Sequence, residues 1–158
     1  MKTAGVEYGI ISLGGNIRTV GTKPSGENFK IGIKHPDSDE YFAIIDTGDC
    51  SVITSGAYQR NFTREGKTYH HIIDPETGYP ADSDIQSVTI IGEDGALCDA
   101  LSTAIFIGGS DYAAKLYKQS IFFDYAILTK DNKVIASQGL QERLSIADGF
   151  EHLDITYR

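Results

Sequence analysis

The 158-residue sequence is poor in cysteine and in positive charge. Its two cysteines, Cys50 and Cys98, belong to no CxxC pair and stand among apolar or small residues, which predicts two buried thiols. Lysine and arginine number 14 against 22 aspartates and glutamates, a formal net charge of −8. General binding to nucleic acid or anionic membranes requires a basic surface, so we expect no nucleic-acid partner. No apolar run approaches the ~20 residues of a transmembrane helix, so no membrane span is expected.

Common nucleotide-binding motifs are also missing, because the chain has neither a G-x-G-x-x-G sequence nor a P-loop. A nucleotide ligand is still compatible with the negative charge, since backbone N–H groups and one metal ion can hold a diphosphate. Hydrophobic residues make up 41% of the chain, enough for an ordinary core. No repeat or linker divides the sequence, and residues 1–158 are interpreted as a single domain.

Residue alternation predicts strands over most of the chain, and helical periodicity is confined to one region. The expected strands are 6–13, 16–20, 29–33, 41–46, 50–54, 62–64, 67–73, 85–91, 122–129 and 134–137. Helical spacing covers 96–107, with Asp94 or Gly95 at its start and Gly108-Gly109 at its end, and a second helix covers 110–118. The tail, 140–158, is interpreted as a short edge strand or helix. The fold class is therefore α+β: a mostly antiparallel sheet with one or two helices packed on a face.

Asp99 and Thr103 stand four residues apart on the expected helix, so they share one of its faces. A carboxylate and a hydroxyl are hard oxygen donors, which suit Mg²⁺ or Ca²⁺ better than zinc. Two alternatives need no metal: a local side-chain hydrogen bond, or a favourable interaction of Asp99 with the helix dipole.

His70 and His71 are adjacent in a strand, so alternation directs them to opposite faces. Histidine can move a proton near neutral pH, but the periodicity does not choose between the two, and a structural histidine fits equally well. Asp74 opens the segment Asp-Pro-Glu-Thr-Gly, whose composition also indicates a plain turn.

Gly14-Gly15 and Ser55-Gly56 are pairs of small residues that follow strand patterns. Glycine allows a backbone to approach a ligand closely, although most such turns are only structural.

Four segments, taken in order, resemble the ApbE-type flavin transferases, which are FAD:protein FMN transferases. The segments are SLGGNIRTVG (12–21), TSGAYQRNF (54–62), YHHIIDPETGYP (69–80) and SVTIIGEDGALCDALSTAIFIGG (87–109). The resemblance extends to about residue 137 and concerns the C-terminal part of the family. It implies an enzyme that transfers FMN from FAD to a threonine or serine hydroxyl of an acceptor flavoprotein, releases AMP and requires Mg²⁺.

Residue by residue, the resemblance assigns Asp99 and Thr103 to the metal, His71 to deprotonation of the acceptor hydroxyl, and Asp74 to a position close to that histidine. It assigns four further residues to loops lining the FAD site: Gly14, Gly15, Ser55 and Gly56. Cys98 departs from the family, in which alanine usually stands before the metal aspartate.

The family is roughly twice as long as this chain, and its N-terminal part is missing here. The resemblance therefore implies that one copy of the chain contains an incomplete FAD site. Apolar surface exposed where the missing part would dock is expected to promote self-association. Two alternatives are a metal-dependent FAD pyrophosphatase and a non-catalytic FAD- or nucleotide-binding fragment. By resemblance, an extracytoplasmic location as a lipoprotein is implied for the full-length form.

Overall fold

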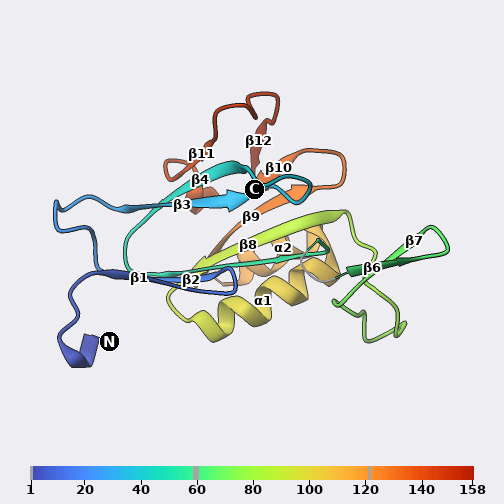
Figure 1. Ribbon diagram of the computed structural model, residues 1–158, viewed down its shortest axis with the longest axis horizontal. Coiled ribbons are helices and arrows are strands. Elements are labelled where there is room, and N and C mark those ends of the chain that lie inside the picture. The colour runs from blue at the N-terminus through green and yellow to red at the C-terminus, as the bar shows by residue number, and fades with distance from the viewer. Residues whose placement is uncertain (1, 59–60, 121) are drawn as a thin grey trace.

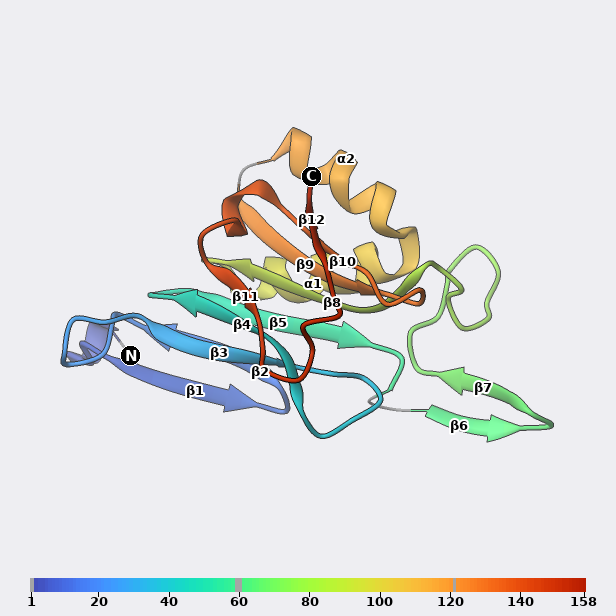
Figure 2. The ribbon, with the colours of Figure 1, turned by 90° about the horizontal axis from the view of Figure 1, so that it is seen from above.

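A computed structural model describes residues 2–58, 61–120 and 122–158, and it arranges them in three layers (Figure 1). A seven-stranded sheet forms the middle layer. Two helices cover one face of this sheet, and a three-stranded sheet covers the other, as a second view also shows (Figure 2). This architecture confirms the predicted α+β class.

The seven-stranded sheet has the order β1-β2-β5-β8-β9-β10-β12. Neighbouring strands are antiparallel except for β10 and β12, which are parallel. The central strand, β8, is the β-branched segment expected over 85–91. The strands are β1 (Gly9–Leu13), β2 (Asn16–Val20), β5 (Ser51–Gly56), β8 (Ile85–Gly92), β9 (Phe123–Thr129), β10 (Val134–Ala136) and β12 (Ile155–Tyr157).

The remaining strands form two smaller sheets. The three-stranded sheet contains β3 (Phe29–Lys34), β4 (Tyr41–Thr47) and β11 (Leu144–Ile146) in the order β11-β4-β3. The hairpin of β6 (Asn61–Arg64) and β7 (Lys67–His70) projects beyond the end of the large sheet (Figure 2). Two 3-10 turns complete the structure, Lys2–Ala4 and Gln138–Leu140.

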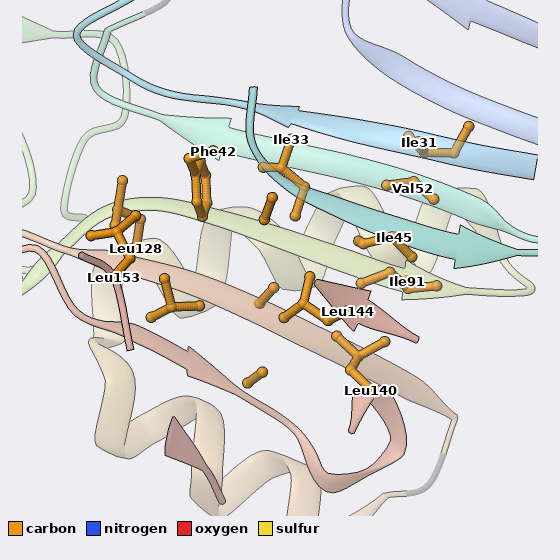
Figure 3. Close-up of a cluster of buried hydrophobic side chains, with 14 of the residues drawn as sticks. Ile31, Ile33, Phe42, Ile45, Val52, Ile91, Leu128, Leu140, Leu144 and Leu153 are labelled. Carbon is orange, nitrogen blue, oxygen red and sulfur yellow. The ribbon is translucent and has the colours of Figure 1, made fainter. Parts of the chain in front are cut away.

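Alternation along the central strands divides the core into two parts. On β5, Val52 packs toward the three-stranded sheet, while Ile53 packs toward the helices. Ile91 and Ile90 repeat this division on β8. Figure 3 shows the first of these clusters, to which the tail contributes Leu140 and Leu144 at the lower right of the view and Leu153 at the left. Its labelled members are Ile31, Ile33, Phe42, Ile45, Val52, Ile91, Leu128, Leu140, Leu144 and Leu153.

The helices are α1 (Gly95–Gly108) and α2 (Ser110–Gln119), each starting and ending close to the predicted positions. The Asp94 carboxylate accepts hydrogen bonds from the backbone N–H groups of Ala96 (2.9 Å) and Leu97 (3.2 Å) and so caps α1. Gly109 ends α1 with a φ of 87°, a left-handed conformation that favours glycine.

Three expected boundaries are different in the structure. The first strand begins at Gly9 rather than residue 6. The strand expected to reach residue 73 ends at His70, and beyond it Ile73 forms only an isolated bridge with Pro80. The tail contains two short edge strands, β11 and β12, in place of a single element. No helix among the described residues is long and apolar enough to cross a membrane.

Candidate functional site

Helix α1 carries Asp99 and Thr103 and contacts three segments that contain or adjoin other predicted site residues. Three segments that are far apart in the sequence contact it one after another between its second and last turns (Figure 1). The contacts are Asn16 with Asp99, Ser55 with Ser102, and His70 with Phe106. One helix therefore contacts, in order along its length, the β1–β2 turn, the end of β5 and the end of β7.

Asp99 and Thr103 lie on α1 four residues apart, as expected, and both are exposed. The Thr103 hydroxyl donates to the backbone carbonyl of Asp99 at 3.3 Å. This is the local hydrogen bond considered as an alternative, but it uses only the hydroxyl proton and leaves the oxygen lone pairs available to a cation. The Asp99 Oδ1 atom accepts a hydrogen bond from Asn16 Nδ2 at 3.3 Å.

Asp99 and Thr103 offer two oxygen donors, fewer than a complete set of metal ligands. Within residues 2–58, 61–120 and 122–158, no three His, Cys, Asp or Glu side chains are grouped so as to hold a metal ion. Mg²⁺, however, usually keeps several waters and binds through one or two carboxylates together with substrate phosphates. The oxygen donors of Asp99 and Thr103 therefore fit Mg²⁺ completed by water and substrate.

The Gly14-Gly15 pair is a two-residue hairpin turn that joins Leu13 to its cross-strand partner, Asn16. The φ angles of 62° and 98° lie in the left-handed region at both positions, as tight hairpin turns require. A Cβ on Gly14 would have no neighbour within 4 Å, so the backbone conformation alone requires glycine there. Whether the turn also lines the FAD site stays a prediction.

The end of β5 is held against α1 by hydroxyl groups. The Ser55 and Ser102 Oγ atoms lie 2.8 Å apart, and the Ser102 hydroxyl also donates to the Asp99 carbonyl at 2.9 Å. Gly56 leaves room for the Tyr58 ring, which a Cβ would approach to 2.5 Å. Ser55 therefore joins β5 to α1, and Gly56 makes room for the Tyr58 ring. Contact of either residue with a ligand stays a prediction.

The two adjacent histidines have different surroundings. His70 is half-buried, its ring lies edge-on to Phe106 with centroids 5.5 Å apart, and its Nε2 lies 3.1 Å from the Ala81 carbonyl. Because a carbonyl oxygen only accepts, Nε2 must carry the hydrogen. His71 is exposed and lines a cleft of about 490 Å³ beside Phe62 and the histidine that precedes it. The two histidines both line this cleft, but they differ in exposure and in hydrogen bonding.

Asp74 forms a tight turn after His71. Its Oδ1 accepts from the Glu76 N–H at 2.9 Å and its Oδ2 from the Thr77 hydroxyl at 3.2 Å, while its carbonyl accepts from the Gly78 N–H at 2.8 Å. These bonds match the turn interpretation of the sequence. A catalytic contribution from Asp74 stays a prediction.

Comparison with known proteins identifies the family. Residues 1–124 match the ApbE family. The chain belongs to the ApbE family. It is 36% identical over 154 residues to an FAD:protein FMN transferase of Klebsiella pneumoniae (strain 342), covering 96% of this chain and 47% of the relative. It is 35% identical over 153 residues to an FAD:protein FMN transferase of Treponema pallidum (strain Nichols), covering 90% of this chain and 42% of the relative.

Solved ApbE structures share the fold. The ApbE protein of Thermotoga maritima aligns with a TM-score of 0.78 and 36% identity, over 86% of this chain and 44% of that protein. The flavin transferase ApbE of Vibrio cholerae aligns with a TM-score of 0.67 and 25% identity, over 96% of this chain and 46% of that protein. The chain thus spans less than half the length of these ApbE relatives.

The departure from the ApbE pattern at Cys98 lies on the inner side of α1. The Cys98 side chain is buried, and its Sγ would be 2.9 Å from a Cβ added to Gly92. Burial, with smaller effects of Cys50 and Asp94, raises the pKa of the Cys98 thiol to about 11. The thiol therefore packs against the sheet as a neutral group.

Asn16 is a candidate site residue that the sequence analysis missed. Its position directly after the Gly-Gly turn was the available signal, because such a turn fixes where the next side chain lies. On the α1 side of the same turn, a cleft of about 340 Å³ is lined by Asn16, Arg18, Leu13 and residues at the start of α1. Asn16 thus both lines this cleft and contacts Asp99.

Proposed function

We propose that this chain carries the metal pair and the proton-accepting histidine of an FAD:protein FMN transferase. The reaction is transfer of FMN from FAD to a threonine or serine hydroxyl of an acceptor flavoprotein, with release of AMP and dependence on Mg²⁺. The observation that carries the proposal is the alignment of Asp99, Thr103 and the segment leading to His71 along α1 in a member of the ApbE family.

The acceptor hydroxyl oxygen attacks the phosphorus of the FMN half of FAD. A new P–O bond forms, the bond between that phosphorus and the bridging oxygen breaks, and AMP leaves with the bridging oxygen. A hydroxyl is a weak nucleophile at neutral pH and needs a nearby base. His71 accepts its proton, because the ring is exposed beside a cleft, whereas His70 Nε2 already donates to Ala81.

Asp74 supports His71 by holding the turn that follows it. Its carboxylate accepts hydrogen bonds from Glu76 and Thr77, so its proposed role is to fix the conformation of the turn rather than to contact the substrate. Asp99 and Thr103 would hold Mg²⁺, which would neutralise charge on the FAD diphosphate as FMN is transferred.

The length of the chain limits its activity. Because it spans less than half of its relatives, we propose that the isolated chain binds FAD weakly and transfers FMN poorly. Large apolar side chains stay open to solvent on the edge strand β1 and near β9, with Leu13 75% and Phe122 74% exposed. We expect this surface to promote self-association.

Calorimetric titration of the 158-residue chain with FAD, with and without Mg²⁺, tests the proposal. We expect weak binding that Mg²⁺ strengthens, and loss of the Mg²⁺ effect in Asp99→Asn but not in Asp148→Asn, a change of an exposed aspartate outside α1. Submicromolar affinity in a monomer would show that the chain forms a complete site. An Mg²⁺ effect that survives Asp99→Asn would remove Asp99 from the metal site.

A second measurement identifies the products. The chain is incubated with FAD, Mg²⁺ and a threonine-containing acceptor peptide, and the peptide mass is recorded. Peptide that carries FMN supports transfer, with a loss expected in His71→Ala and not in His152→Ala, which changes another exposed histidine. Free FMN and AMP without labelled peptide would instead indicate an FAD pyrophosphatase, in which water replaces the acceptor.

A further inference from the structure

The β1–β2 turn fixes the path of the chain at Asn16. Gly14 and Gly15 are its only two loop residues, and Leu13 pairs with Asn16 across it. A two-residue turn sets the register of its hairpin, so the position of Asn16 on β2 is determined by the turn.

Alternation then directs Asn16 toward α1. Ile17 packs into the core toward the three-stranded sheet, so its neighbours Asn16 and Arg18 lie on the helix side of β2. Arg18 donates to the Glu93 carbonyl at 2.8 Å, just before α1, and to Asp49 Oδ1 at 2.7 Å. Arg18 therefore anchors β2 beside the start of α1, and Asn16 reaches Asp99 from this fixed strand.

We infer that Asn16 is a positioning residue for Asp99, an inference that rests on the proposed metal role of Asp99. The Asn16 amide N–H donates to Oδ1 of Asp99, so Oδ2 would be available to bind a cation. The chemistry suits this role because an amide is neutral. A lysine or arginine at this position would pair with Asp99 and compete with the metal, whereas the amide orients the carboxylate and leaves its charge uncompensated.

Two substitutions of Asn16 have opposite expected effects. Asn16→Ala removes the hydrogen bond and frees the Asp99 side chain, and we expect Mn²⁺ affinity to fall about tenfold, the low end for loss of a residue that orients a metal ligand. Asn16→Asp places a second carboxylate beside Asp99, so repulsion lowers the unfolding temperature without metal. With metal present, the added oxygen ligand increases the metal-induced stabilisation above that of the wild type.

The test measures thermal unfolding of the 158-residue chain with and without Mg²⁺, and Mn²⁺ binding by electron paramagnetic resonance. Gln141→Glu is the control, because it makes the same amide-to-carboxylate change at an exposed residue of the loop before β11. A residue with only a structural role would lower stability equally with and without metal. The inference requires two results for Asn16→Asp. Without metal it must unfold at a lower temperature than the wild type, and on addition of metal its unfolding temperature must rise by more than that of the wild type.

Failure of this inference can be distinguished from failure of the proposed function. If Asp99→Asn abolishes Mn²⁺ binding while Asn16→Ala changes it less than about twofold, Asp99 binds metal and the positioning role of Asn16 is wrong. Equal responses to metal in Asn16→Asp and Gln141→Glu would also overturn that role. If Asp99→Asn leaves Mn²⁺ binding unchanged, or if the wild-type chain does not respond to either metal, both the metal pair and the inference are wrong.

Discussion

Replacing each of the two adjacent histidines should separate stability from catalysis. His70→Ala removes the hydrogen bond to the Ala81 carbonyl, worth about 1 kcal/mol, and the edge-on contact with Phe106, worth about 0.5–1.5 kcal/mol. It also removes Nδ1, which is buried without a hydrogen-bond partner among the described residues, and this recovers part of the loss. We expect a net destabilisation of about 1–2 kcal/mol.

His71→Ala should leave stability within about 0.5 kcal/mol of the wild type, because the side chain is exposed. Its effect on FMN transfer should be a loss of about 10²–10⁴-fold, as is usual for removal of a general base. FAD affinity should change much less, because the ring acts on the acceptor proton.

Urea denaturation followed by circular dichroism measures the first effect, and transfer to the acceptor peptide measures the second. His70→Phe is the matched control, since it keeps a ring against Phe106 and replaces both ring nitrogens with carbon; it should lose less stability than His70→Ala. Greater destabilisation by His71→Ala than by His70→Ala would refute the structural assignment. A larger loss of transfer in His70→Phe than in His71→Ala would refute the catalytic assignment.

Three further predictions concern groups away from His71. Partial burial raises the pKa of Asp84, but hydrogen bonds from the Ser110 hydroxyl and N–H outweigh it and lower the pKa below its ordinary 3.8. Asp84→Asn should therefore cost about 1–2 kcal/mol near pH 7, and urea midpoints should show this difference shrinking as the pH falls through the lowered pKa. The thiol of Cys98, with a pKa of about 11, should react with a thiol reagent at pH 8 only after unfolding, as absorbance would show in a Cys50→Ser background. Tyr125→Phe should match the wild type or be up to about 1 kcal/mol more stable in urea, because the buried Tyr125 hydroxyl has no hydrogen-bond partner in the described structure.

Local signals in the sequence were sufficient for much of the fold. The strands expected over 62–64 and 67–73 leave only Glu65 and Gly66 between them, and φ angles of 53° and 76° at these residues confirm a two-residue hairpin turn. The start of α1 was predicted because aspartate is a favourable N-cap, and Asp94 has that role. Both features depend only on residues that are close to each other in the sequence.

Features that depend on distant residues were not predicted. The helix α2 has no capping side chain of its own; instead Asp84, 26 positions before Ser110, accepts hydrogen bonds from its first residue. The parallel pairing of β10 with β12 likewise joins segments whose sequences do not indicate a partner. Local propensity contains no information about such contacts.

The ambiguity between the histidines has a particular cause. His70 shares the alternation of Ile72, and His71 shares that of Ile73. The two isoleucines are chemically identical, so the pattern cannot indicate which side is buried. In the structure Ile72 is 5% exposed and Ile73 is 45% exposed, which places His70 on the inner side and His71 on the outer side. Packing of the His70 ring against Phe106, a residue distant in the sequence, determines which histidine lies on the inner side, and periodicity cannot predict this contact.

The positions of Asp99 and Thr103, the proposed metal pair, depend on the core through α1. At about 100° per residue, a helix that buries Cys98 and Ser102 against the sheet presents the next residue in each case, Asp99 and Thr103, on its exposed side. The buried contacts therefore set the rotation of the helix and, with it, the direction of both proposed metal ligands. A bulkier residue at Cys98 would meet Gly92 and turn α1 about its axis, which would move Asp99 away from Asn16. The geometry of the proposed site is thus controlled partly by residues that cannot touch a ligand, because the same helix packs against the sheet and carries Asp99 and Thr103.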